Sequence, residues 1–142
     1  MNLADNIKII SKFKKEDLSK FVYNNQYASV FQTPDMAEVY KRDKTCKPLV
    51  FVAIDETGEI VGSMLAKIID EKPGFLSSFS RHSTIRGGPI FKNSEEGIVA
   101  VSLLLQHYNN IAKKDVIYSR IYPLYEIPRT VTSCFIKNGY KY

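Results

Sequence analysis

The chain has 142 residues, of which 44% are hydrophobic and 12% are aromatic. This composition excludes an intrinsically disordered protein and fits one domain with a buried core. The formal net charge of +5 favours anionic partners only weakly, and the lysines are too dispersed along the chain to indicate a nucleic-acid interface.

The two cysteines, Cys46 and Cys134, stand far apart in the sequence and lack the spacing of metal ligands. We therefore predict a reduced, cytoplasmic protein with no metal site. The first residues lack the basic and then apolar pattern of a signal peptide. Because the apolar runs stay well short of the ~20 residues that span a bilayer, we predict no transmembrane segment.

The first third of the chain predicts one strand and two helices. Alternating apolar residues predict a strand over Asn6–Ser11, and apolar residues at helical spacing predict a helix over Lys15–Tyr23. The polar stretch 24–30 predicts a loop. Thr33 has the side chain of an N-cap and is followed by proline, which predicts a helix over Pro34–Lys44.

Two long apolar runs follow and predict the centre of a sheet. Leu49–Ile54 and Ile60–Ile69 are rich in β-branched residues and are joined by the polar turn 55–59, so they predict an antiparallel hairpin. Phe75–Phe79 is interpreted as a loop or a strand edge. The run Ile85–Phe91 predicts another strand.

The last third predicts two helices around a strand. Apolar residues recur at i, i+3, i+4 and i+7 over Gly97–Lys113, which predicts a helix, and the alternation of Asp115–Ile121 predicts a strand. Pro128–Asn138 predicts a final helix that ends at a glycine. Tyr140–Tyr142 is interpreted as the start of one more strand.

The cap of the Gly97–Lys113 helix is assigned to Asn93 or Ser94, with Glu95 and Glu96 favourable in the first turn. The predicted order of elements is therefore β-α-α-β-β-β-α-β-α. A hairpin followed by strand, helix, strand and helix indicates an α+β fold with a mixed sheet flanked by helices.

This order is similar to the GNAT fold of acyl-CoA N-acyltransferases. Four stretches, which read FQTPDMAEVY, IRGGPI, YSRIYP and FIKNGY, narrow the resemblance. They resemble, in the same order, motifs of the FemAB-like transferases, and they lie at residues 31–40, 85–90, 118–123 and 135–140.

The resemblance implies that residues 1–142 form one GNAT-like domain, the N-terminal part of a longer two-domain protein, with the last strands of the sheet missing. It also implies a cytoplasmic aminoacyl- or acyltransferase that forms an amide on a cell-wall or polysaccharide precursor. This domain would bind the acceptor, which would be a cell-wall or sugar-nucleotide small molecule. The full-length protein would take aminoacyl-tRNA or acyl-CoA as donor, and this part alone would be inactive.

The sequence departs from these patterns at residues 36–41 and at the turn 92–97. Met36 stands where the FemAB-like motif has tryptophan. Lys41 lies next to the position where members of that family often carry a phosphate-binding lysine, rather than at it. The turn 92–97 lacks the glycine-rich pattern that binds pyrophosphate in the GNAT fold. Its two acids, Glu95 and Glu96, would repel a pyrophosphate, so we expect no cofactor in this part of the protein.

The stretch Ser80–Phe91 combines two arginines, a histidine, two glycines and a proline. Its glycines do not lead directly into a helix, which argues against a phosphate loop and favours a strand with a bulge. Arg81 and Arg86 are candidate anion-binding residues because a guanidinium matches phosphate or carboxylate oxygens, and surface ion pairs are the alternative. His82 lacks a readable partner for general-base catalysis.

Tyr118 and Arg120 share one face of their predicted strand, and the resemblance places that strand beside the acceptor groove. The predicted substrate-binding set is therefore Arg86, Arg120, Tyr118, Arg81 and Lys41, with no catalytic residue assigned.

Two other functions stay open. The first is a non-catalytic module that binds a glycan or nucleotide-sugar, or that dimerises through an open sheet edge. The second is RNA binding, which fits the basic charge but lacks an aromatic and basic motif.

Overall fold

The computed structural model describes residues 2–72 and 74–141. Its strands form one mixed sheet in the order β1-β2-β3-β4-β6, with β5 also paired to β3. The β4–β6 pair is parallel, and the other pairs are antiparallel. The elements are η1 (Leu3–Asn6), β1 (Lys8–Ile10), α1 (Lys15–Tyr23), η2 (Val30–Gln32), α2 (Pro34–Arg42), β2 (Cys46–Ile54), β3 (Ile60–Ile69), η3 (Gly74–Phe79), β4 (His82–Gly87), β5 (Ile90–Phe91), α3 (Glu95–Ala112), β6 (Ser119–Pro123) and α4 (Arg129–Lys137).

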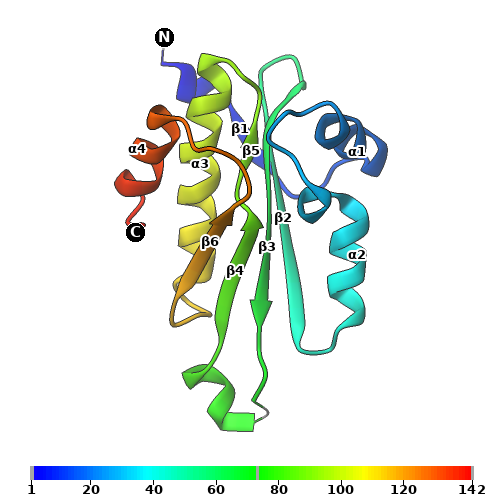
Figure 1. Ribbon diagram of the computed structural model, residues 1–142, viewed down its shortest axis with the longest axis vertical. Coiled ribbons are helices and arrows are strands. Elements are labelled where there is room, and N and C mark those ends of the chain that lie inside the picture. Colours follow the sequence, from blue (N-terminus) through cyan, green and yellow to red (C-terminus); the bar gives the residue numbers. More distant parts are fainter. Residues whose placement is uncertain (1, 73, 142) are drawn as a thin grey trace.

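The helices form two layers on the sheet. Helices α1 and α2 cover one face over β2 and β3, and helices α3 and α4 pack together on the other face (Figure 1). The predicted hairpin is confirmed as β2 and β3, which pair along their whole length. The predicted α+β fold with a mixed sheet flanked by helices is confirmed.

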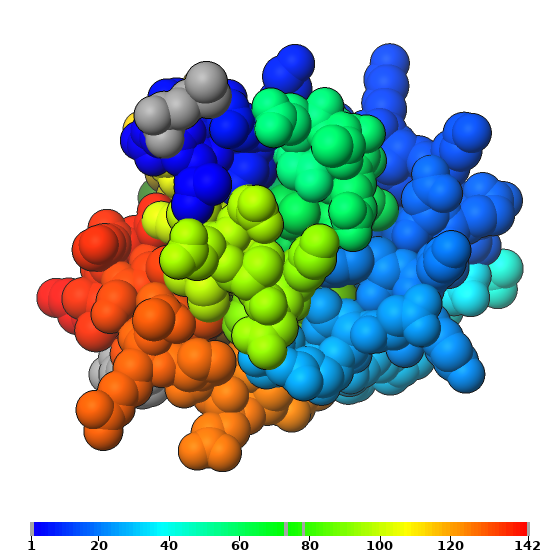
Figure 2. Space-filling model, turned by 90° about the horizontal axis from the view of Figure 1, so that it is seen from above, coloured from blue at the N-terminus to red at the C-terminus, as the bar shows by residue number. Residues whose placement is uncertain are grey.

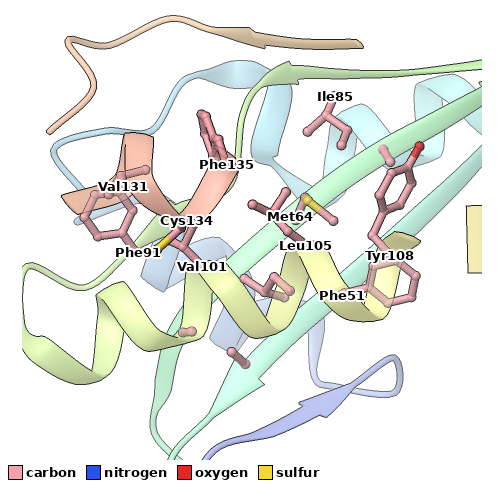
Figure 3. Close-up of a cluster of buried hydrophobic side chains, with 14 of the residues drawn as sticks. Phe51, Met64, Ile85, Phe91, Val101, Leu105, Tyr108, Val131, Cys134 and Phe135 are labelled. Carbon is pink, nitrogen blue, oxygen red and sulfur yellow. The ribbon is translucent and has the colours of Figure 1, made fainter. Parts of the chain in front are cut away.

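The core lies mainly between α3 and the sheet. One side of α3 is fully buried, with Val101, Leu105 and Tyr108 facing Met64 and Ile85 of the strands (Figure 3). A smaller cluster lies under α1 on the opposite face. Burial of these side chains explains why the apolar periodicity of α3 was a reliable signal.

Local caps fix where the helices begin. The Thr33 hydroxyl accepts a hydrogen bond from the Met36 N–H at 3.1 Å and starts α2. The Ser94 hydroxyl accepts one from Gly97 at 3.1 Å and starts α3, so the cap is Ser94 rather than Asn93. Helix α4 ends at the predicted glycine, since Gly139 has φ +89°.

Three predicted elements are corrected. Phe75–Phe79 is neither loop nor strand edge but lies in the 3₁₀-helix η3. The strand predicted at Asp115–Ile121 begins only at Ser119, because the N–H groups of Asp115 and Val116 still bond to the Ala112 carbonyl at the end of α3.

The strand predicted at Tyr140–Tyr142 is the third correction. Tyr140 and Lys141 lie outside any strand, and Tyr142 lies outside the described residues. The Tyr140 hydroxyl donates instead to Asn109 at 2.8 Å, which ties this segment to α3.

The predicted strand Ile85–Phe91 is divided into β4 and β5. Gly87 and Gly88 both have positive φ, at +86° and +70°, and interrupt the strand before Pro89. Strand β4 pairs with β6 as far as Gly87, whereas β5 pairs only with β3. The β4–β5 break, residues 88–89, is therefore the point where the sheet opens between β4 and β6.

Candidate functional site

The candidate site lies on the face of β4 and β6 that is on the same side of the sheet as helices α1 and α2. Helices α1 and α2 pack on β2 and β3 and lie to one side of β4 and β6 (Figure 1). Arg86, Tyr118, Arg120 and Tyr122 are all exposed there. The predicted residues Arg86, Arg120 and Tyr118 are thus brought to one surface.

The pairing of β4 with β6 sets these side chains in rows. Thr84 lies opposite Arg120, and Arg86 lies opposite Tyr122. The His82 and Tyr118 rings stack one step earlier, with centroids 5.1 Å apart. We call this surface the β4–β6 face; its members are His82, Thr84, Arg86, Tyr118, Arg120 and Tyr122.

Aromatic rings hold both guanidinium groups of this face. The Arg86 guanidinium carbon lies 5.0 Å from the centroid of the Phe31 ring, and that of Arg120 lies 5.0 Å from the Tyr118 ring. These are cation–π contacts that orient a guanidinium without neutralising it. A hydrogen bond with the Tyr122 side chain raises the pKa of Arg120.

The two arginines lie on neighbouring strands. Their positions on neighbouring strands place the Cα atoms about 8 Å apart. Within residues 2–72 and 74–141, the carboxylate ion pairs involve neither guanidinium. Neither guanidinium is therefore neutralised by a carboxylate of these residues, and both retain N–H donors for an anionic ligand.

Helix α2 extends the same face. The Lys67 ammonium lies 4.7 Å from the centroid of the Tyr40 ring. Burial raises the pKa of the Tyr40 hydroxyl, and the nearby charge of Arg86 partly opposes that shift. A positive field thus reaches from β6 across β4 to the inner side of α2.

His82 has a defined ring orientation. Its Nδ1 lies 3.2 Å from the Ser80 carbonyl oxygen. When that nitrogen carries the proton and donates it to the carbonyl, the neutral ring presents Nε2 as an acceptor. His82 therefore offers the β4–β6 face a hydrogen-bond acceptor beside Tyr118. The other histidine, His107, packs edge-on against Phe51 in the α3 interface.

The structure separates Arg81 from this group. Its Nε lies 3.3 Å from an Asp70 oxygen, its Nη1 lies 3.8 Å from Asp115, and its Nη2 donates to the Ser77 hydroxyl at 2.8 Å. Arg81 thereby joins the β3–β4 and α3–β6 connections. Arg81 therefore forms ion pairs within the protein at the end of the sheet, which is the alternative to anion binding named above.

Lys41 also lies apart from the two arginines. It pairs with Glu38 one turn earlier on α2, with 3.2 Å between nitrogen and oxygen, and both side chains are exposed. Lys41 lines a hollow of about 360 Å³ between α2 and the outer part of β2. The five predicted residues thus divide into a group of three and two separate positions.

Side chains of the chain itself close the β4–β5 break. The Tyr125 hydroxyl donates to the Pro89 carbonyl at 2.7 Å, and the Gln32 amide donates to the Gly88 carbonyl at 3.4 Å. The Asn25 amide donates to the Phe91 carbonyl at 2.8 Å. Seen from above, the segment after the break lies between the α1–η2 segment and the β6–α4 loop (Figure 2).

Three aromatic rings complete this closure. Tyr27 stacks on Phe91 with centroids 4.4 Å apart, and Tyr125 packs against Tyr27 at 5.1 Å. Burial strongly raises the pKa of Tyr125, so its hydroxyl stays protonated and remains a donor. The carbonyls of Gly88, Pro89 and Phe91 therefore all accept hydrogen bonds from side chains of the protein.

The start of α3 is equally unsuited to a pyrophosphate. Glu95 is exposed and Glu96 is half-buried in its first turn. A Cβ on Gly97 would stand 1.8 Å from the Lys92 carbonyl oxygen, so only glycine fits this tight turn. A hollow of about 590 Å³ beside Tyr27 and Tyr125 remains next to the break. The pyrophosphate of the acyl-CoA that a GNAT fold implies does not fit the start of α3, because that helix start is acidic.

The outer edge of β6 carries a further hollow. It measures about 360 Å³, lies between β6 and α4, and includes Ile121, Ile127 and Ile136 in its apolar lining. A second hollow of about 610 Å³ adjoins it and shares Ser119 and Tyr140. The β6 edge is thus an open and largely apolar surface.

Sequence reasoning missed Phe31 and Thr84 as members of this region. Phe31 and Gln32 begin the stretch FQTPDMAEVY. The Phe31 ring contacts the Arg86 guanidinium, and the Gln32 amide donates a hydrogen bond to the Gly88 carbonyl, so this stretch contacts the stretch IRGGPI. Three of the four motif stretches therefore meet around the β4–β6 face. The signal was present in the order of those motifs, but their contacts depend on the fold.

No protein-family model matches the sequence, and none of the curated proteins is a detectable relative. Solved structures do match. An acetyltransferase of Trypanosoma brucei is 16% identical with a TM-score of 0.62, over 96% of this chain and 94% of that one. The glucosamine-6-phosphate N-acetyltransferase of Arabidopsis thaliana is 14% identical with a TM-score of 0.63, over 96% and 92%. The chain has the GNAT fold.

A third GNAT structure, the ribosomal-protein-alanine N-acetyltransferase of Brucella melitensis, is 11% identical over 96% of this chain and 93% of that one, with a TM-score of 0.62. At such identities the likeness concerns the fold. Among residues 2–72 and 74–141, no helix is long and apolar enough to cross a membrane. The same part of the chain has no cluster of three or more side chains placed to hold a metal ion.

Proposed function

We propose that this GNAT domain binds the acceptor of an acyl transfer reaction on its β4–β6 face. The observation that carries the proposal is the pair Arg86 and Arg120, two guanidinium groups on adjacent strands held by aromatic rings rather than by carboxylates. A phosphate or carboxylate group would be bound by both. Tyr118 and Tyr122 would flank a sugar or another ring.

The reaction class that fits is amide formation. A neutral amine of the acceptor attacks the carbonyl carbon of an activated ester or thioester, the C–N bond forms, and the C–O or C–S bond breaks. The amine proton passes to water or a base, and finally to the leaving group. This chain contributes binding and orientation of the acceptor.

We place the donor elsewhere than the β4–β5 break, because the two carbonyls of the break already accept hydrogen bonds from Gln32 and Tyr125. In the finer form of the proposal, the chain is the N-terminal domain of a FemAB-like transferase in the cytoplasm. Its acceptor is a cell-wall or polysaccharide precursor, and a second domain binds aminoacyl-tRNA or acyl-CoA. The motif stretches around the β4–β6 face support this form.

Titration with UDP-linked sugars and muropeptide precursors tests the proposal. Loss of a charge-assisted hydrogen bond costs about 1.5–3 kcal/mol, so Arg86→Ala and Arg120→Ala should each raise Kd roughly 10-fold to 100-fold. Arg129→Ala is the matched control, because Arg129 is exposed at the start of α4. Calorimetry of the purified chain gives Kd, and melting curves check that each variant is folded.

The outcomes separate the parts of the proposal. Equal binding by Arg86→Ala and the unaltered protein would exclude the β4–β6 face as the acceptor site. Binding of acetyl-CoA at micromolar concentration would contradict the closed break. Precursor binding that depends on both arginines, without acetyl-CoA binding, is the expected result.

A second candidate function is self-association through β6. The Ser83 N–H donates to the Tyr118 carbonyl at 3.0 Å, and in a parallel ladder this directs the backbone groups of Ser119 and Ile121 away from the sheet. Such an edge can pair with a second copy. In an antiparallel pair centred on Ile121, Arg120 of one copy faces Tyr122 of the other.

Two substitutions at Tyr122 that introduce opposite charges test this pairing, because they should have opposite effects on a dimer. Tyr122→Lys sets like charges across the interface and should abolish a dimer, whereas Tyr122→Glu faces Arg120 of the other copy and should tighten it. Sedimentation velocity over a concentration series gives the dissociation constant. A monomer at every concentration for the unaltered chain would remove this candidate.

A further inference from the structure

The end of the molecule opposite the β4–β5 break carries exposed aromatic side chains. Helix η3 projects beyond the sheet at the bottom of the ribbon view (Figure 1). The Phe75 side chain is 83% exposed and that of Phe79 is 74% exposed, and Leu76 between them is also exposed. Three large apolar residues within six positions, on a projecting element, form a patch rather than scattered single residues.

Two neighbouring loops belong to the same end. The Asp70 N–H donates to the Thr45 carbonyl at 2.8 Å, which joins the β3–β4 connection to the α2–β2 loop. The Ile117 N–H donates to the Arg81 carbonyl at 2.9 Å, which joins it to the α3–β6 loop. Ile117 is exposed and extends the apolar surface. We call these three connections with η3 the η3 end.

The three connections of the η3 end carry a net positive charge. Residues 42–47, 70–81 and 113–118 contain seven basic and four acidic residues, a net charge of +3. Two of the acids, Asp70 and Asp115, already pair with Arg81. The exposed cations of these connections are Arg42 and five lysines, namely Lys44, Lys47, Lys72, Lys113 and Lys114.

We propose that the η3 end binds an anionic lipid surface, with Phe75 and Phe79 inserted at the level of the headgroups and the lysines against the lipid charges. Each lysine near an anionic bilayer adds attraction, and buried aromatic area adds an insertion energy that does not depend on salt. An end of the molecule that carries both exposed phenylalanines and exposed lysines has the complementary chemistry on both counts. This inference does not depend on the acceptor site, which lies on the β4–β6 face.

The proposal does not require a spanning helix. It describes a peripheral contact in which side chains of a short element enter the interface while the domain stays in water. Neither a single short apolar tip nor a few lysines would hold the protein alone, so both parts should be necessary at physiological salt.

Co-sedimentation with vesicles tests the proposal. The vesicles are pure phosphatidylcholine, or phosphatidylcholine and phosphatidylglycerol in equal parts. Binding is expected only with the anionic vesicles, and it should weaken as salt is raised. The double variant Phe75→Ser with Phe79→Ser should lower the partition coefficient at least about tenfold. The pair Lys44→Glu with Lys47→Glu should lower it by a similar factor.

Tyr23→Ser is the matched control, because the Tyr23 ring is 91% exposed on α1, away from the η3 end (Figure 1). That variant should bind vesicles as the unaltered protein does. Circular dichroism and melting curves of all variants establish that each is folded. The substituted side chains are exposed, so their replacement should leave the fold intact.

The absence of tryptophan from the chain allows a second readout. Phe75→Trp gives a single indole whose emission should shift to shorter wavelength with anionic vesicles, and Tyr23→Trp should show no shift. Unchanged emission at position 75 would overturn the proposal, as would vesicle binding that the double phenylalanine variant retains. Self-association lost in that variant, without any vesicle binding, would assign the tip to a protein contact and also overturn it.

Discussion

At the scale of single residues, the contact between Gly87 and Gln32 explains why two distant parts of the sequence depend on each other. A Cβ at Gly87 would stand 1.9 Å from the Gln32 amide nitrogen. The buried Gln32 side chain also accepts the Ser29 N–H and donates to the Gly88 carbonyl. Gly87 therefore has to be glycine for two reasons, its positive φ and the space that Gln32 fills.

Gly87→Ala should therefore destabilise the protein more than the backbone conformation alone requires. Gly58 has the same φ of +86°, but a Cβ there would meet nothing within 4 Å. We expect Gly58→Ala to cost about 1–2 kcal/mol for the left-handed conformation. Gly87→Ala should cost at least about 1 kcal/mol more, because the Gln32 amide must leave a buried hydrogen bond. Urea unfolding of both variants gives the two free energies.

A double-mutant cycle separates the two causes. In the presence of Gln32→Ala, the extra cost of Gly87→Ala over Gly58→Ala should largely disappear, since the space is then free. If the extra cost stays the same in that background, the clash with Gln32 is not its cause.

At the scale of elements, the sequence predicted those helices and strands whose apolar pattern faces a single neighbour. The α3 helix buries one continuous side against the sheet, and the β2–β3 hairpin is buried along its centre, so periodicity and burial agreed. The η3 helix leaves its apolar side chains exposed, so no buried face supported a prediction of a helix there.

The start of β6 shows a different limit. The alternation of Val116, Ile117 and Tyr118 has the period of a strand, yet these residues belong to the connection from α3. Where β4 begins decides where β6 can begin, because a parallel strand pairs only where its neighbour offers free backbone groups, and Ser119 pairs with Ser83 at the start of β4. That information lies outside the segment itself.

The candidate site was predictable only in part for the same reason. The alternation of β6 placed Tyr118 and Arg120 on one side, and residue type alone singled out Arg86. That they lie on one surface follows from the pairing of β4 with β6, which no local pattern contains. The ion pairs of Arg81 and the position of Lys41 on α2 likewise depend on distant partners.

At the scale of the whole molecule, three tyrosines that are buried or half-buried connect separate regions. Tyr125 closes the β4–β5 break, Tyr140 ties the C-terminal segment to α3, and Tyr108 joins α3 to β6 through a 2.6 Å contact with Ser119. Burial raises the pKa of all three hydroxyls. These three hydroxyls therefore stay protonated in the folded protein up to a higher pH than in the unfolded chain.

This shared direction predicts that the protein loses stability in alkaline solution. Unfolded tyrosine has a pKa of about 10, so above that pH the unfolded chain binds fewer protons than the folded one, and the free energy of unfolding falls as pH rises. The slope is at most about 1.4 kcal/mol per pH unit for each such tyrosine. Urea unfolding from about pH 8 to pH 11 measures it. Tyr125→Phe should lower stability at neutral pH, because the Pro89 carbonyl loses its hydrogen-bond donor. The same variant should lose less stability per pH unit in alkaline solution than the unaltered protein. An equally steep loss in both proteins would show that Tyr125 has the same pKa in the folded and unfolded states.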